Sequence, residues 1–134
     1  TILGVSRGTT RAHLVRATLE AIAFEVQDVV DLMVREAGVA IPELAVDGGA
    51  SANDLLCQLQ ADALQVPVAR AAQLETTGLG AAFLAGLGTG VWSSTDELAA
   101  VVHRDARFEP GPADERAHQR WRVAVERSKS WANL

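Results

Sequence analysis

The sequence has little of what disulfide-linked or nucleic-acid-binding proteins require. Its 134 residues contain one cysteine, Cys57, which cannot form an intramolecular disulfide, so we expect a reducing, cytoplasmic setting. Lysine and arginine number 12 against 17 aspartates and glutamates, which gives a net charge of −5. Because this balance provides no broad cationic surface, we expect no nucleic-acid partner.

Clusters of metal ligands and strongly apolar runs are also missing. The histidines His13, His103 and His118 lie far apart, without cysteine or carboxylate at ligand spacing, so we expect no metal site. The longest uncharged stretch, residues 76–95, is rich in glycine, threonine and serine. It predicts a buried helix with an exit loop and no membrane partner. No basic and apolar leader opens the chain at Thr1, which also fits a cytoplasmic setting. The chain starts without a methionine, directly on the apolar run 1–5, so we expect a segment of a longer protein.

What the sequence does contain is the composition of one globular domain, with 49% hydrophobic and 22% charged residues. Short apolar runs bounded by turn residues predict strands at 2–5, 44–46 and 66–69. Apolar periodicity and start signals predict helices at 13–35, 55–64, 76–86, 93–101 and 114–131. An irregular stretch is expected at 108–112. The alternation of strands and helices predicts a largely parallel sheet, with ligands beyond the carboxyl ends of its strands.

Several residues are predicted to begin, end or pack these helices. Thr9 or Thr10 should cap the first long helix and Gly38 should end it, while Ser51 or Asn53 should cap the second. The apolar face of the first helix comprises Val15, Leu19, Ile22, Val26, Val29 and Met33. The apolar contacts of the last helix are Trp121, Val125 and Trp131.

The most informative stretch is Asp47-Gly48-Gly49-Ala50-Ser51-Ala52-Asn53, which joins a predicted strand to a helix. Paired glycines allow a backbone to approach a ligand closely, and a helix start directs amides toward it. A purely structural turn explains the same spacing equally well. A hydrolase nucleophile elbow is disfavoured because Asn53 replaces a required glycine, so Ser51 is interpreted as a cap. The run at 86–90 indicates a helix end rather than a dinucleotide loop.

Two further sets of residues resemble one family. Gly4-Val5, seven residues, His13-Leu14, two residues and Ala17-Thr18-Leu19-Glu20 resemble the second half of the signature of FGGY carbohydrate kinases. The stretch from Val46 to Asn53, with Gln60-Ala61-Asp62 and Val66-Pro67-Val68 after it, is similar to the adenosine-binding turn of the glycerol kinases in that family. Residues 75–86 and the anchors Phe108, Pro110, Trp121 and Trp131 extend the likeness over nearly the whole chain.

The resemblance implies an α/β fold, part of an actin-like ATPase (ribonuclease H-like) domain with alternating strands and helices. Residues 1–134 would form the C-terminal part of the nucleotide-binding domain, and the upstream domain and polyol site would lie outside them. Gly49 would lie against the nucleotide, Asn53 would contact it through its side-chain amide, and Gly48 would permit the turn. No catalytic residue or metal ligand is placed within these residues.

The activity implied is phosphorylation of glycerol with ATP and Mg²⁺ by a cytoplasmic, homo-oligomeric enzyme that binds ATP and ADP. The isolated segment is expected to be inactive, because the residues that bind glycerol and take its proton lie upstream. Two alternatives stay open: a kinase for another polyol or sugar of the family, and a non-enzymatic actin-like scaffold module.

Overall fold

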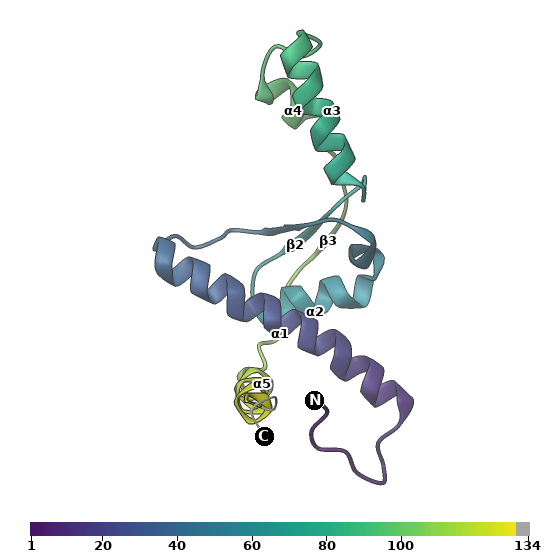
Figure 1. Ribbon diagram of the computed structural model, residues 1–134, viewed down its shortest axis with the longest axis vertical. Coiled ribbons are helices and arrows are strands. Elements are labelled where there is room, and N and C mark those ends of the chain that lie inside the picture. The colour runs from purple at the N-terminus through teal and green to yellow at the C-terminus, as the bar shows by residue number, and fades with distance from the viewer. Residues whose placement is uncertain (131–134) are drawn as a thin grey trace.

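A computed structural model describes residues 1–130, and its longest helix is α1, Arg11–Ala37 (Figure 1). Thr10 caps this helix: its hydroxyl accepts from the His13 amide at 3.4 Å, and the His13 ring accepts from the Thr10 amide at 3.1 Å. Gly38 ends it with a left-handed φ of 65°, which glycine adopts without a steric penalty. The predicted cap at Thr10 and stop at Gly38 are confirmed, and the helix begins two residues before the predicted start.

The sheet has three strands in the order β1 (Leu44–Val46), β2 (Val68–Ala71) and β3 (Arg104–Phe108). β1 and β2 are parallel, as predicted, although β2 starts two residues later than expected. β3 is antiparallel to β2 and was not predicted. Its five residues include only one large apolar side chain, Phe108, so neither an apolar run nor an alternation marked it as a strand.

The strand predicted at residues 2–5 is wrong. These residues are irregular, and Ile2 and Val5 are 67% and 64% exposed. They lie away from the sheet, on the side where α5 is found (Figure 1). Because a strand requires a neighbour for its backbone groups and none of β1–β3 pairs with this stretch, its apolar side chains alone do not make it a strand.

The core lies between the sheet and α2, Asp54–Leu64. Cys57 and Ala61 of α2 pack on Val68 of β2, and all three are fully buried. α2 also packs against α1, where Ala23 is the buried residue. The predicted apolar face of α1 is wrong in part, because four of its members are exposed: Val15, Ile22, Val29 and Met33.

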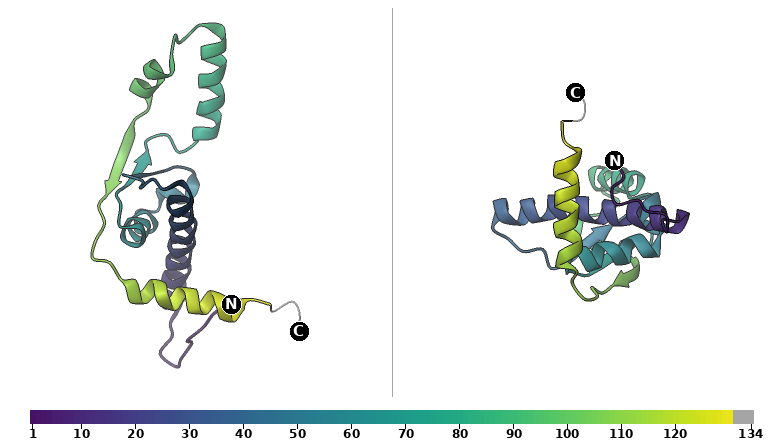
Figure 2. Two further views of the ribbon diagram at one scale, coloured as in Figure 1. Left: turned by 90° about the vertical axis from the view of Figure 1, so that its left-hand side faces the viewer. Right: turned by 90° about the horizontal axis from the view of Figure 1, so that it is seen from below.

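α3 (Thr76–Thr89) and α4 (Thr95–Val101) extend from one end of the sheet (Figure 2). The prediction that α3 is buried is wrong: among its residues only Gly86 is buried. A Cβ on Gly86 would lie 2.1 Å from the Trp92 ring, so its lack of a side chain permits close packing, as expected for this small-residue helix. Gly90, with φ of 78°, caps the C-terminus of α3, which confirms the predicted helix end.

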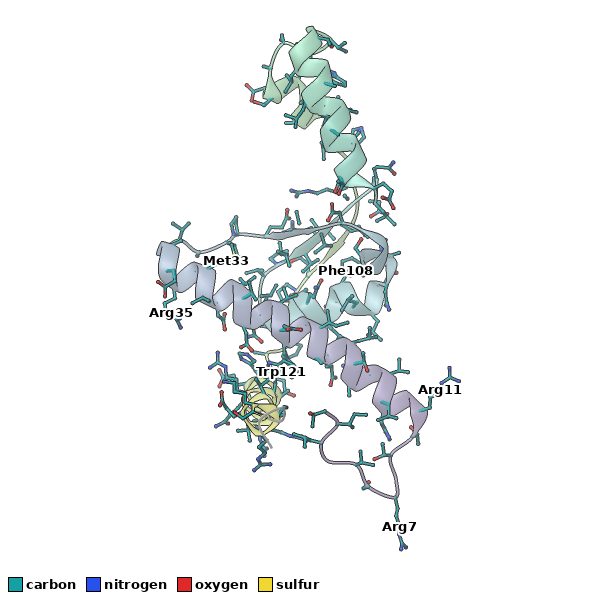
Figure 3. The ribbon with its side chains drawn as sticks, viewed as in Figure 1. Arg7, Arg11, Met33, Arg35, Phe108 and Trp121 are labelled. Atoms are coloured by element: carbon teal, nitrogen blue, oxygen red, sulfur yellow. The ribbon has the colours of Figure 1, made fainter. Side chains whose placement is uncertain are left out.

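α5 (Glu115–Ser128) crosses α1 at the other end of the molecule, and Trp121 lies between the two helices (Figure 3). Asp28 of α1 accepts hydrogen bonds from the Trp121 indole at 2.8 Å and the His118 ring at 2.9 Å. Burial acts to raise the pKa of Asp28, but these two hydrogen bonds, together with attraction to His118 and Arg122, outweigh it and the pKa is lowered. Trp121 is thus confirmed as an anchor, whereas Trp131 lies outside the described residues.

Within residues 1–130, no helix combines the length and the apolar character needed to cross a lipid bilayer.

Candidate functional site

The turn after β1 depends on Gly48. This residue has φ of 80° and ψ of 170°, a conformation that side-chain-bearing residues rarely adopt, and its amide donates to the Leu74 carbonyl at 2.9 Å. A short 3₁₀ helix, η1 (Gly49–Ala52), follows directly. The expectation that Gly48 permits the turn is confirmed. Gly49 lies outside the left-handed region, so only the first glycine of the pair is required by backbone conformation.

The sequence left open whether Ser51 or Asn53 caps α2, and in the structure the two residues have different roles. The buried Ser51 hydroxyl donates to the Gly48 carbonyl at 2.7 Å, so this bond joins η1 to the start of the turn. Asn53 is the cap of α2, because its side-chain oxygen accepts from the Leu56 amide at 3.2 Å. The interpretation of Ser51 as a cap is wrong, since its oxygen faces back to the start of the turn rather than forward to α2.

The three residues that the resemblance assigns to the nucleotide site, Gly48, Gly49 and Asn53, lie on this one turn at the carboxyl end of β1. Gly49 and Asn53 are exposed. A Cβ built on Gly49 meets no protein atom within 4 Å, so the space over this backbone is open. Because the Asn53 side-chain oxygen is held by the helix cap, its amide nitrogen is the atom left to face a ligand.

A residue that was not predicted, Arg70, stabilises the turn through hydrogen bonds. It lies on β2 opposite Val46, and its side chain is only 15% exposed. One guanidinium nitrogen donates to the Ser51 carbonyl at 3.1 Å and to the Asp54 carboxylate at 2.7 Å. The Nε atom donates to Asp105 of β3 at 2.9 Å. The sequence signal was an arginine two residues after the buried Val68, which places it on the same face of the strand.

The charges under the turn reinforce each other. The hydrogen bond to Asp105 and then that to Asp54 raise the pKa of Arg70 further above its already high value, so this side chain stays cationic. It also lies over the Phe108 ring, with 5.7 Å between the guanidinium carbon and the ring centroid. Burial raises the pKa of the neighbouring Cys57 thiol, which donates to the Ser51 carbonyl at 3.2 Å. A neutral thiol at this position is structural rather than nucleophilic.

The other candidate features lie elsewhere. Glu20, within the signature-like stretch, pairs with Arg16 at 2.6 Å on α1 and lies outside the turn. An open hollow is found between the first half of α1 and α2, and it is lined by Arg11, Ala12, Val15, Arg16, Leu19 and Leu55. Figure 3 labels Arg11, at the start of α1. In the part of the chain that the structure describes, no three histidine, cysteine, aspartate or glutamate residues gather in a way that could hold a metal ion.

Comparisons with known proteins agree on one family. Residues 1–89 match the C-terminal domain of the FGGY family of carbohydrate kinases. The chain is 54% identical over 134 residues to a glycerol kinase of Aromatoleum aromaticum and 49% identical over 134 residues to one of Deinococcus radiodurans. Each alignment covers 98% of this chain but 27% of the relative, so the chain spans about a quarter of the length of these proteins.

Solved structures give the same picture. The crystal structure of Plasmodium falciparum glycerol kinase with ADP matches with a TM-score of 0.82 and 33% identity, over 96% of this chain and 26% of that protein. A xylulose kinase from Rhodospirillum rubrum matches with a TM-score of 0.79 and 28% identity, over 95% of this chain and 27% of its own. The predicted α/β fold, a part of an actin-like ATPase domain, is confirmed by these neighbours. The chain belongs to the FGGY family of carbohydrate kinases.

Proposed function

We propose that the full-length protein transfers the terminal phosphoryl group of ATP to glycerol, and that this chain supplies part of the nucleotide site. The observation that carries the proposal is the open, glycine-built turn at the carboxyl end of β1, in a chain 54% identical to a glycerol kinase. A likeness to a glycerol kinase crystallised with ADP supports the nucleotide assignment. Residues 1–134 would then be the C-terminal part of the nucleotide-binding domain.

Within the turn, each residue has a distinct proposed role. Gly49 offers bare backbone with open space above it, which suits the close approach of a flat nucleotide base or ribose. The Asn53 amide is fixed in direction because its oxygen caps α2, so it can donate to the ligand without losing freedom on binding. Gly48 sets the path of the backbone between them.

The chemistry of phosphoryl transfer falls outside this chain. Mg²⁺ in the complete enzyme would neutralise phosphate charge, but residues 1–130 offer no group of ligands for it. The contribution of this chain is therefore to hold and orient the nucleotide. Homo-oligomerisation of the complete enzyme remains a proposal from the family resemblance, and sedimentation of the full-length protein tests it. Cytoplasmic location likewise remains a prediction from the single, free cysteine.

The test is a coupled assay of ADP release by the purified full-length protein with ATP, Mg²⁺ and a panel of acceptors. We expect glycerol to be used with the highest kcat/KM, well above xylulose and gluconate. Preference for another polyol or sugar would support the second candidate, to which the 28% identical xylulose kinase points. Nucleotide binding without transfer to any acceptor would favour a scaffold.

The isolated 134-residue chain serves as the control and provides a prediction of its own. We expect it to release no ADP above background with glycerol, because the residues that bind the polyol and remove its proton are proposed to lie upstream. Glycerol phosphorylation by this purified chain, free of the rest of the protein, would show that the proposed division of the site is wrong.

A further inference from the structure

Arg70 reaches the turn because of its register in the sheet. It pairs with Val46, the last residue of β1, across the parallel ladder. Val68, two residues earlier on the same strand, points into the core against α2, so Arg70 faces the same side. The guanidinium therefore lies at the N-terminal end of α2, next to the segment that joins β1 to η1.

The bonds of Arg70 connect three elements through one rigid group. They join the Ser51 carbonyl of η1, the Asp54 carboxylate in the first turn of α2 and the Asp105 carboxylate of β3. A guanidinium is planar and presents its donors in a fixed fork, so it fixes the relative positions of its acceptors as well as their charge. Asp54 is 74% exposed, so attraction between the two charges is a weak part of this arrangement.

The connection continues to the residues that face the ligand. Ser51, whose carbonyl Arg70 holds, donates its own hydroxyl to the Gly48 carbonyl at 2.7 Å. Asp54 directly follows Asn53, the cap of α2. The Arg70 guanidinium therefore bonds to one residue on each side of the turn, Ser51 and Asp54. Gly49 and Asn53 remain exposed to solvent.

We propose that Arg70 is a positioning residue for the nucleotide: it sets the height and orientation of the turn that carries Gly49 and Asn53 without touching the ligand itself. The inference rests on the proposed function, because it takes this turn as part of a nucleotide site. It assigns to a β2 side chain the specific task of keeping the turn in its binding geometry.

The experiment uses full-length protein carrying Arg70→Gln, Arg70→Lys or Arg107→Gln. Arg107 is the matched control, because it is an arginine on the neighbouring strand whose carboxylate partners, Glu43 and Glu109, lie outside the turn. The readouts are the Kd of ADP by titration calorimetry, the KM values of ATP and glycerol, and thermal unfolding. ADP binding requires no acceptor alcohol, so it reports on the turn independently of substrate choice.

We expect Arg70→Gln to weaken ADP binding and raise the KM of ATP about five- to tenfold, because the turn is displaced rather than removed. The KM of glycerol should change less than about twofold. Arg70→Lys should lie between wild type and Arg70→Gln, because lysine restores the charge but not the fork. Arg107→Gln should leave the Kd of ADP within about twofold of wild type, even if it lowers the unfolding midpoint as much as Arg70→Gln does.

Unchanged ADP affinity in folded Arg70→Gln, or an equal loss in Arg107→Gln, would overturn the inference. If Arg70→Gln does not fold, Asp105→Asn is measured instead, because it weakens the Arg70 bond that lies farthest from the turn. We then expect a smaller loss of ADP affinity, and no loss would overturn the inference. Wild-type protein that binds ADP, loses it on Arg70→Gln, yet does not phosphorylate glycerol refutes the glycerol proposal alone. Wild-type protein that binds no ADP refutes both.

Discussion

Replacing Gly49 separates the effect of a side chain on the ligand from its effect on the fold. A Cβ at this position meets no protein atom within 4 Å, and the residue does not need a positive φ. Alanine in place of a glycine whose conformation it can adopt typically stabilises a protein by about 0.4–1 kcal/mol. The folded state of Gly49→Ala should therefore be at least as stable as wild type, and Gly49→Val should fold.

ATP binding should weaken in the same variants, although their fold is not destabilised. If the nucleotide lies against the bare backbone, a methyl group must push it away, and a valine side chain must push it further. We expect the KM of ATP to rise about three- to tenfold in Gly49→Ala and more than tenfold in Gly49→Val, where tenfold corresponds to about 1.4 kcal/mol. The KM of glycerol should stay within about twofold, because no residue of this chain is proposed to contact the polyol.

Gly48→Ala is the matched control. Its side chain would also meet open space, but at φ of 80° and ψ of 170° it strains the backbone by about 1–3 kcal/mol. We therefore expect a lower unfolding midpoint for Gly48→Ala and an unchanged or raised midpoint for the Gly49 variants, measured by thermal unfolding of the full-length protein. Steady-state kinetics with each substrate varied in turn completes the test. A folded Gly49→Val that keeps its KM for ATP, or loses glycerol instead, would refute the assignment of this turn.

Three further predictions concern the cap, the packing of α3 and the docking of α5. Asn53→Ala should cost about 1 kcal/mol of stability through the lost cap and raise the KM of ATP but not that of glycerol, as kinetics and thermal unfolding would show. Gly86→Ala gains about 1 kcal/mol of helix propensity, but its Cβ would lie 2.1 Å from the Trp92 ring, so displacement of the ring should dominate and lower stability by about 1–3 kcal/mol; unaltered tryptophan fluorescence and midpoint would contradict this. The lowered pKa of Asp28 means that its contribution to docking α5 is fully present above the ordinary value of 3.8 and lost as the pH falls through the lowered one. Hydrogen exchange of α5 amides, corrected for intrinsic rates, should show lower protection in Asp28→Asn at pH 7 and a smaller fall below about pH 4 than in wild type; equal acid sensitivity of the two proteins would show that Asp28 is not responsible.

Local signals in the sequence predicted most elements because they depend on neighbouring residues. Thr10 and Gly38 mark the ends of α1, since a cap hydroxyl and a left-handed glycine act within one turn of the helix. β1 and its parallel partner β2 followed from apolar runs next to turn residues. β3 could not be found this way, because charged residues make up most of it and its place is set by pairing with β2.

Burial was harder to predict than secondary structure. Apolar or small residues on α1, α3 and residues 2–5 suggested surfaces that pack, yet within residues 1–130 many of them face outward. A sequence pattern shows that a surface is suited to packing but does not show which element covers it. The strand predicted at residues 2–5 failed for the same reason, since pairing needs a neighbour that local sequence does not specify.

The turn of the candidate site was predicted from the sequence, whereas the arginine that holds this turn was missed. Glycines and a capping asparagine leave a readable pattern, because turn conformation and helix caps limit which residues can be used. Arg70 leaves almost none: its position under the turn depends on a register between β1 and β2 that is fixed only when the sheet forms. Of the two glycines, the sequence could not tell which one the backbone requires. The structure separates them, because Gly48 is held by its positive φ whereas nothing within the described chain prevents a side chain at Gly49. A glycine at a position where the fold would accept alanine is what a site for a closely approaching ligand requires.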